Sequence, residues 1–447
     1  MFSRVLIANR GEVAVRVIRT LHELGIEAVA IYSTADKDSL HVRMADRAVC
    51  VGPPPAGQSY LNIPSVVAAG ETTRCDAVHP GWGFLAENAA FVRACADNDL
   101  VFIGPSAETM EEMGDKVEAK AAMAKAEMPL IPGTEHAVGP DDARAAADEL
   151  GYPVLLKAAA GGGGRGMRLV ESPDELEDVF QGAAAEANAA FGDGSLYLEK
   201  AIVPARHVEI QVLADGQGGV LTLGERECSI QRRHQKLIEE SPSPALAPAL
   251  REEMEAAVER ACLQLGYRNA GTFEFLLGPE GGFYFMELNA RLQVEHPVTE
   301  LVTGLDLVRE QVRVAAGEKL ERTGRAERRG HALEVRINAE DVARDFAPAP
   351  GRIERFRAPL GPGVRMDTHV ESGTVVSPFY DSLIGKVIVW DLDRPSAIAR
   401  GIRALSELEV IGIPTTRELA IAILRGEAFA SGRYSTSFLD EMAPVAA

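Results

Sequence analysis

Two strand-like runs separated by a tight turn constrain the fold more than any other part of the sequence. Residues 272–276 and 283–289 are rich in aromatic side chains, and the Pro-Glu-Gly-Gly sequence between them is typical of a turn. An antiparallel hairpin with this turn places Glu274 opposite Glu287. Because side chains alternate between the two faces of a strand, Glu274, Glu287 and Asn289 should share one face. Oxygen ligands in this arrangement suit a hard cation, so the hairpin predicts a magnesium site, with a solvent-facing polar strand as the alternative.

Polar residues continue at alternate positions after the hairpin. Arg291, Gln293 and Glu295 are followed by His296 and a proline, which disfavours a helical conformation for the residue before it, so this segment is predicted to be extended. The three polar heads would then point the same way, where a guanidinium, an amide and a carboxylate could bind and deprotonate a small anion. A salt-bridged surface strand is the alternative.

The net charge and the cysteine pattern exclude several classes of protein. The 447 residues are 46% hydrophobic and carry a formal net charge of -20, which argues against a general binder of nucleic acid or of anionic membranes. The five cysteines are widely spaced and contain no CxxC pair, which argues against a zinc site or a disulfide framework and favours a reducing compartment. With no recognisable signal peptide and no long apolar run, a cytoplasmic protein outside the membrane is expected.

The N-terminal region has the pattern of a doubly wound α/β domain. Residues 3–33 read as a strand, a loop, an amphipathic helix and a second strand, but the loop contains the lone Gly11 rather than GxGxxG, which is weak evidence for nucleotide binding. A Pro-Gly-Trp-Gly loop at 80–83 follows a predicted strand, where α/β sheets bind ligands, although a structural turn explains it equally well. Residues 106–128 are then predicted to form one helix, capped by Ser106.

A glycine-rich loop in the middle of the chain is flanked by two short apolar runs. Gly161 to Gly164 therefore join strand to strand, unlike Walker and Rossmann loops, which lead into a helix. Such a loop can bind phosphate only through its backbone amides and through Lys157 and Arg165, and it is predicted to be a mobile lid, with a flexible linker as the alternative. A basic run at 232–236 would suit phosphate or bicarbonate, or would simply be solvated surface.

These motifs together resemble the biotin carboxylases of the ATP-grasp superfamily. The resemblance extends over nearly the whole chain, through IANRGE, HPGWGFLAEN, MGDK, GGGGRGM, RHVEIQV, ERECSIQRRHQK, GTFEF, MELNARLQVEHPVTE, GHALEVRINAED and PFYDSLIGK. It implies an α/β fold with α+β character in three domains. These would be an N-terminal doubly wound α/β domain (1–115), an ATP-grasp domain (116–317) with a mobile glycine-rich lid (about 131–203), and a C-terminal domain of short strands and helices (330–447).

The resemblance also implies a set of residues for each ligand. Contacts with ATP are expected from Lys116, Lys157, Gly163, Gly164, Glu199, Lys200, Ala201, Ile202, His207 and His234, those from Glu199 to Ile202 through the backbone. Magnesium or manganese would be held by Glu274, Glu287 and Asn289. Bicarbonate would be held by Lys236, Arg291, Gln293, Val294 and Glu295, and Arg336 would face the ureido oxygen of biotin.

The implied activity is the ATP-dependent carboxylation of biotin with bicarbonate, through carboxyphosphate, as the first half-reaction of an acyl-CoA carboxylase such as acetyl-CoA carboxylase. Glu295 would act as the base, and Lys236, Arg291 and Arg336 would stabilise charge. The alternatives are a pyruvate carboxylase-type complex and another ATP-grasp carboxylate ligase. A nucleotide-sensing module without chemistry is disfavoured, because Glu295, Arg291 and Arg336 are all present.

The expected partners follow from the same resemblance. No methionine is followed by lysine and the chain ends soon after residue 436, so biotin is expected on a separate biotin carboxyl carrier protein. We also expect a homodimer and a carboxyltransferase subunit, without nucleic acid or membrane. Three positions depart from the usual family pattern: Trp82 replaces a tyrosine, Ala160 a glycine and Ala290 a threonine. The first removes a phenol from the expected biotin pocket.

Overall fold

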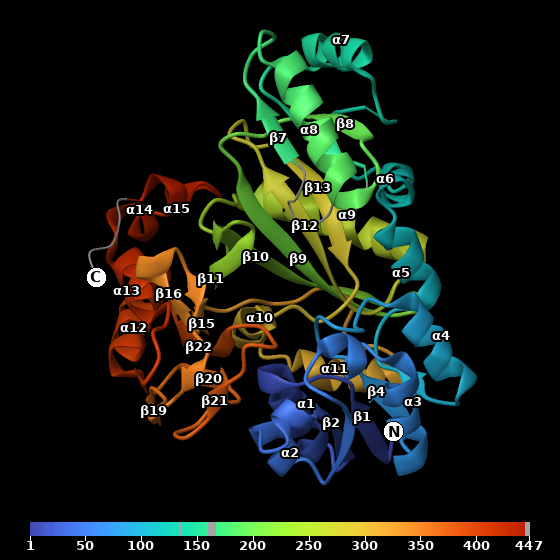
Figure 1. Ribbon diagram of the computed structural model, residues 1–447, viewed down its shortest axis with the longest axis vertical. Coiled ribbons are helices and arrows are strands. Elements are labelled where there is room, and N and C mark those ends of the chain that lie inside the picture. The colour runs from blue at the N-terminus through green and yellow to red at the C-terminus, as the bar shows by residue number, and fades with distance from the viewer. Residues whose placement is uncertain (135, 160–166, 443–447) are drawn as a thin grey trace.

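Three larger β-sheets, with three two-stranded ones, organise the chain in the computed structural model, which describes residues 1–134, 136–159 and 167–442 (Figure 1). A five-stranded parallel sheet contains the N-terminal strands, a nine-stranded sheet occupies the centre, and a three-stranded sheet lies at the top of the view. This arrangement confirms the predicted α/β fold with α+β character. Among the described residues, no helix is both long enough and apolar enough to cross a membrane.

The N-terminal sheet has the order β3-β2-β1-β4-β5, and all its strands are parallel. Its strands are β1 (Arg4–Ile7), β2 (Glu27–Ser33), β3 (Arg47–Gly52), β4 (Ala77–His79) and β5 (Val101–Phe102), and its helices are α1 (Gly11–Glu23), α2 (Leu40–Met44), α3 (Ile63–Thr73) and α4 (Ala89–Asp97). The central strand β1 is almost entirely apolar and buried, as a parallel strand covered by helices on both faces must be. The doubly wound N-terminal domain predicted from the sequence is thereby confirmed.

The prediction of one helix over 106–128 is wrong. The structure has two helices, α5 (Ala107–Gly114) and α6 (Lys116–Lys125), separated by Asp115. The Asp115 carboxylate accepts hydrogen bonds from the backbone amides of Val117 and Glu118, so it caps a new helix instead of continuing the old one. Ser106 does cap the first helix, by accepting from the Thr109 amide.

The three-stranded sheet, in the order β7-β6-β8, forms a small unit with its own core. Its elements are β6 (Val154–Ala158), β7 (Met167–Val170), β8 (Leu196–Lys200), α7 (Pro140–Leu150) and α8 (Leu176–Phe191). Strands β6 and β7 are antiparallel neighbours, so the glycine-rich segment joins strand to strand as predicted. Gly163 and Gly164, like the rest of residues 160–166, lie outside the described residues.

The central sheet runs in the order β13-β12-β9-β10-β11-β15-β22-β20, and β14 pairs with β10. Its strands are β9 (Arg206–Asp215), β10 (Val220–Arg232), β11 (Gln235–Ser241), β12 (Arg268–Leu277), β13 (Phe283–Asn289), β14 (Gly324–Arg325), β15 (His331–Asn338), β20 (Val364–Thr368) and β22 (Leu383–Asp391). Because β11 pairs with β15, the sheet crosses the boundary predicted between the ATP-grasp and C-terminal domains. This pairing brings side chains about 100 positions apart in the sequence onto adjacent strands.

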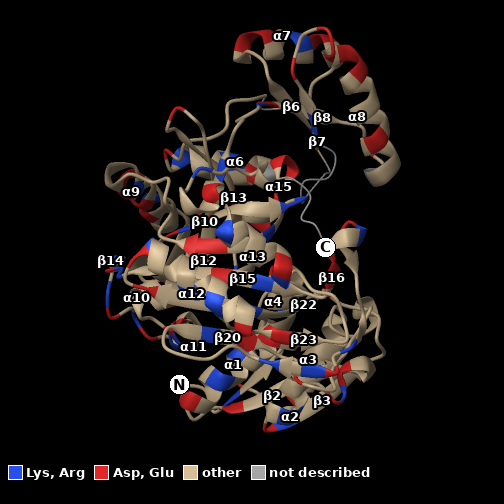
Figure 2. Cartoon of the chain, turned by 90° about the vertical axis from the view of Figure 1, so that its left-hand side faces the viewer, with Lys and Arg blue, Asp and Glu red and all other residues tan. Residues whose placement is uncertain are grey.

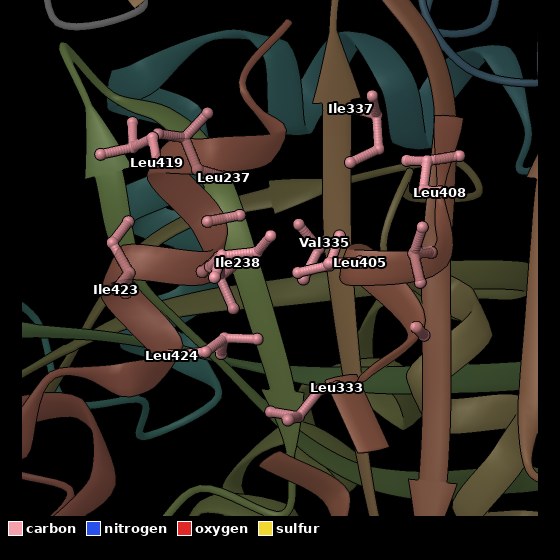
Figure 3. Close-up of a cluster of buried hydrophobic side chains, with 14 of the residues drawn as sticks. Leu237, Ile238, Leu333, Val335, Ile337, Leu405, Leu408, Leu419, Ile423 and Leu424 are labelled. Carbon is pink, nitrogen blue, oxygen red and sulfur yellow. The ribbon is translucent and has the colours of Figure 1, made fainter. Parts of the chain in front are cut away.

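Helices and short strands cover this sheet. The helices are α9 (Pro248–Leu265), α10 (His296–Thr303), α11 (Leu307–Ala315), α12 (Arg394–Glu407), α13 (Arg417–Arg425), α14 (Glu427–Ala430) and α15 (Phe438–Glu441). The short strands are β16 (Glu340–Asp341), β17 (Ala347–Pro348), β18 (Gly351–Arg352), β19 (Arg355–Arg357), β21 (Val375–Val376) and β23 (Glu409–Ile411). Figure 3 shows Ile238 and Val335, on neighbouring strands, packed against Leu405 of α12 and Leu424 of α13. These side chains form a core on one face of the sheet, so its polar face lies on the opposite side, where the candidate site is found.

Candidate active site

The hairpin has the predicted register. Glu274 on β12 lies directly opposite Glu287 on β13, and Asn289 shares their face, with its Nδ2 donating to Glu274 Oε1 at 2.9 Å. The phenylalanines on the opposite face, Phe273 and Phe285 among them, are buried in the core. A β-bulge in β13 between Phe285 and Glu287 interrupts the alternation, so Phe285 turns into the core while Glu287 and Asn289 face the site.

Lys236 is the centre of the site. Its Nζ lies 2.6 Å from a Glu209 oxygen, 2.8 Å from Glu274 Oε1 and 2.7 Å from Glu295 Oε1. Burial alone would lower the pKa of Lys236, but the three carboxylates raise it well above its ordinary value, so the ammonium is retained at neutral pH. In Figure 2 acidic and basic segments alternate across β10, β12 and β15 in the middle of the molecule.

The basic run at 232–236 divides into two environments. Arg232 and Arg233 both form ion pairs with Asp345 near the surface, and His234 is exposed at the turn between β10 and β11. Only Lys236 enters the cluster of carboxylates, with its side chain 10% exposed. Arg232, Arg233 and His234 therefore lie at the surface, as the alternative interpretation predicts, and binding of phosphate or bicarbonate by Lys236 stays a prediction.

Glu295 is held by two cations. In addition to Lys236, Arg336 on β15 donates from its terminal nitrogen to Glu295 Oε2 at 2.9 Å, while its Nε donates to Glu239 Oε1 at 2.6 Å. Burial of Glu295 would raise its pKa, but the charges of Lys236 and Arg336 outweigh it and hold the pKa well below the usual range. The carboxylate is therefore ionised and shielded from water at neutral pH.

The segment after the hairpin differs from its predicted extended form. Val294 and Glu295 form a turn and α10 begins at His296, because a proline is tolerated in the first turn of a helix, where its missing N–H is not needed. The polar heads still converge. Arg291 donates to Gln293 Oε1 and to Asn289 Oδ1, both at 2.9 Å.

Three residues that contact this site were not selected from the sequence. Glu209 lies on the polar face of β9, which the alternation around His207 had indicated without singling it out. Arg226 on β10 is fully buried and donates to Glu209, Gln211, Thr272 and Thr299. Glu87, from the N-terminal domain, accepts from Arg291 Nε at 2.6 Å and from the Ala290 amide at 3.0 Å, a contact that no local pattern could reveal.

Of the described residues expected to contact ATP, those from Lys157 to Ile202 lie on or beside the small sheet, whereas His207 on β9 and His234 after β10 belong to the central sheet. Lys157 on β6 and Lys120 on α6 both form ion pairs with the buried carboxylate of Glu199 on β8. Lys200 instead donates to the carbonyl groups of Gly151 and Tyr152, so its side chain ties the sheet to α7. Ala201 and Ile202 follow directly on β8, and Lys116 begins α6.

The carboxylates of the hairpin fit a divalent cation. His207 Nε2 lies 3.0 Å from Glu274 Oε2, a close ion pair rather than a well-aligned hydrogen bond. Partial burial and the neighbouring charge of Glu274 raise the pKa of Glu287. The site therefore has two opposed carboxylates beside an amide oxygen, and the charge of Glu274 destabilises the ionised form of Glu287. A hard cation bound by these oxygens would stabilise both carboxylates.

The loop around Trp82 is held by the start of the chain. Asn9 Nδ2 donates to the carbonyl oxygens of Pro80 at 2.7 Å and Trp82 at 2.8 Å. The Trp82 indole packs against the core of the N-terminal domain, and its Nε1 is buried without a hydrogen-bond partner among the described residues. The loop is thus a well-supported turn at the carboxyl end of β4.

Fold and site together define an ATP-dependent ligase of the ATP-grasp class. Three family models match the chain in succession: "Biotin carboxylase, N-terminal domain" over residues 1–110, "Carbamoyl-phosphate synthase L chain, ATP binding domain" over 115–323, and "Biotin carboxylase C-terminal domain" over 334–441. The biotin carboxylase of Nostoc sp. is 54% identical over 443 residues, which cover 99% of both chains. The chain belongs to the biotin carboxylase family.

Two further relatives are similar over almost the whole chain. A pyruvate carboxylase subunit of Methanothermobacter thermautotrophicus is 52% identical over 443 residues, 99% of this chain and 90% of the relative. The biotin carboxylase domain dimer of the Hydrogenobacter thermophilus 2-oxoglutarate carboxylase was solved with MgADP, ADP and bicarbonate. It matches with a TM-score of 0.92 at 46% identity, covering 99% of this chain and 98% of that one.

Proposed function

We propose that this chain carboxylates biotin with bicarbonate and ATP, through carboxyphosphate, on a carrier protein. One observation carries the mechanism: Glu295 is a buried, ionised carboxylate held between Lys236 at 2.7 Å and Arg336 at 2.9 Å. This geometry supports a base, a cation for phosphoryl charge and a cation for an oxyanion around a single point. General-base and oxyanion chemistry both need such preorganised groups.

In the first step Arg291 and Gln293 hold bicarbonate, with the Val294 backbone alongside, and Glu295 takes its proton. The bicarbonate oxygen then attacks the γ-phosphoryl group of ATP in line, and ADP leaves. Lys236 stabilises the negative charge on the equatorial oxygens. Because Lys236 contacts three carboxylates in the free protein, it exchanges part of this pairing for the phosphoryl oxygens when substrates bind.

In the second step carboxyphosphate breaks down to CO₂ and phosphate. The phosphate removes the N1′ proton of biotin, and Arg336 stabilises the negative charge that develops on the ureido oxygen. The biotin nitrogen then attacks CO₂. Arg336 is already oriented for this role, because Glu239 holds its Nε at 2.6 Å.

The remaining ligands are assigned to the neighbouring residues. Glu274, Glu287 and Asn289 would hold magnesium or manganese, which when bound neutralises phosphate charge. The contacts with ATP are proposed for Lys116, Lys157, Gly163, Gly164, the backbone of Glu199 to Ile202, His207 and His234. We assign these functions to domains at 1–115, 116–317 and 330–447, with residues of about 131–203 acting as a mobile lid over the nucleotide.

The biological setting is part of the same proposal. Biotin is presented by a carrier protein, and the carboxylated carrier then serves a carboxyltransferase subunit of an acyl-CoA carboxylase in the cytoplasm. The enzyme acts as a homodimer without nucleic acid or membrane. Acetyl-CoA as the final acceptor has one specific rival, pyruvate, because the archaeal pyruvate carboxylase subunit is 52% identical over nearly the whole chain.

Bicarbonate-dependent ATP hydrolysis in the presence of free biotin tests the proposal. We expect phosphate release to require both bicarbonate and a divalent cation, and to be stimulated by biotin. A biotinylated carrier should become carboxylated under the same conditions. ATP turnover that requires a larger carboxylic acid in place of bicarbonate would contradict this activity and identify a different ATP-grasp ligase.

A further inference from the structure

A lysine on β22 contacts the turn that carries the base. The Lys386 side chain is fully buried, and its Nζ donates to the carbonyl oxygen of Val294 at 2.7 Å. That carbonyl belongs to the peptide unit that joins Val294 to Glu295, directly before α10. The hydrogen bond therefore fixes the orientation of the peptide from which Glu295 projects.

The same ammonium is anchored from the N-terminal domain. Glu12, in the first turn of α1, places its Oε1 3.2 Å from Lys386 Nζ, and its side chain is 1% exposed. Neither Glu12 oxygen accepts a hydrogen bond from any described residue, so the ion pair with Lys386 is what balances its charge. Glu12 is the last residue of the Asn-Arg-Gly-Glu sequence at the start of α1, to which the sequence alone assigned no function.

The other titratable groups around Lys386 differ in their charge and in their partners. Burial raises the pKa of Glu334 well above its usual range, and neither of its oxygens has a hydrogen-bond partner among the described residues. Asp367 is paired with Arg365 at 2.6 Å. Burial and the nearby cations hold the pKa of His296 well below its usual range, so the imidazole is uncharged. Among the described residues, Glu12 is the one carboxylate that forms an ion pair with Lys386, at 3.2 Å.

We infer that Lys386, held in place by Glu12, is a positioning residue for the base Glu295. The inference rests on the proposed function and adds to it a connection among three separated parts of the chain. The Val294 peptide is fixed from β22, and β22 is tied in turn to α1. Displacement of a reacting group by about 1 Å can cost on the order of 10²-fold in rate, so loss of this hydrogen bond should lower turnover.

Two variants separate positioning from simple burial of charge. Lys386→Met removes the donor but leaves Glu12 as an unpaired buried charge, which destabilises the fold. Glu12→Gln with Lys386→Met removes both charges and should recover most of the thermal stability. We expect both Lys386 variants to lose about tenfold to hundredfold in kcat for bicarbonate-dependent ATP hydrolysis, with the KM for ATP within about twofold.

A second measurement does not depend on activity. In the protein without substrates, amide hydrogen exchange over residues 290–298 should be faster in the double variant than in the wild type, whereas exchange over α9 should not change. Arg394→Met is the matched control, because it removes a cation from the buried carboxylate of Glu240 outside the site. It should alter stability without changing exchange over 290–298.

Recovery of both stability and kcat in the double variant would overturn the inference, as would unchanged exchange over 290–298. If the double variant does not fold, Glu12→Gln alone decides, since loosening the anchor should lower kcat and quicken the same exchange. Unchanged values in that variant would equally refute the positioning role. A wild-type protein without bicarbonate-dependent turnover would instead contradict the proposed function, and the exchange comparison would still test Lys386.

Discussion

Replacing Glu295 with glutamine removes one negative charge from the middle of the site and keeps the side-chain volume. Two cations lose a carboxylate partner, Lys236 at 2.7 Å and Arg336 at 2.9 Å. Lys236 keeps Glu209 and Glu274, and Arg336 keeps Glu239, so neither cation is left unpaired. The loss in the free energy of unfolding should therefore lie at or below the low end of the about 3–5 kcal/mol typical of a broken buried pair.

The effect on activity should be much larger than the effect on stability. An amide cannot accept the bicarbonate proton, and loss of a general base typically lowers a rate by about 10² to 10⁴, or roughly 3–5 kcal/mol of activation free energy. Nucleotide binding should persist, because Lys157 and Glu199 lie on the small sheet and do not contact Glu295. The predicted variant is thus folded, able to bind ATP, and nearly inactive.

Three measurements check this prediction. Phosphate release with and without bicarbonate measures activity, calorimetry measures ATP binding, and a thermal melt measures stability. Glu334→Gln is the matched control: Glu334 is equally buried, but its carboxyl group makes no hydrogen bond to Lys236, Arg336 or any other described residue. This control should keep its activity. Turnover by Glu295→Gln within about threefold of the wild type would refute the role as base, and lost ATP binding would identify a structural residue instead.

Three further predictions address the metal, the lid and pH. Glu274→Gln and Glu287→Gln should each raise the metal concentration needed for half-maximal turnover, and unchanged metal dependence in both would contradict the hairpin site. Amide exchange in β6 and β7 should slow when a non-hydrolysable nucleotide and magnesium are added; equally slow exchange in the free protein would rule out a lid. Burial raises the pKa of Glu239 to about 7, against about 4.3 for a free glutamate. Its contribution to stability should be complete below pH about 4.3 and be lost as the pH rises through about 7. In urea titrations, the free energy of unfolding of Glu239→Gln should decline less between these two pH values than that of the wild type. An identical dependence on pH in the two proteins would count against the raised pKa of Glu239.

Local sequence patterns predicted the elements that build the metal site. The aromatic and polar residues over 272–276 and 283–289 predicted the two strands and the pairing of Glu274 with Glu287, but not the β-bulge beside that pair. Local signals failed where two of them competed. Asp115 reads as an ordinary helix residue until its carboxylate caps α6, and the proline after His296 starts a helix where an extended segment was expected.

The sequence by itself determined which residue types are available, the strands on which they lie and the family they resemble. Only the tertiary structure decided which charges meet. Lys236 contacts carboxylates from β9, β12 and the turn before α10. Arg336 lies beside them because β15 pairs with β11. The ionisation of Glu295 depends on its burial and on both cations together. Pairing energies and pKa shifts depend on distance and burial in space, which the order of strands in the sheet sets and spacing along the chain does not.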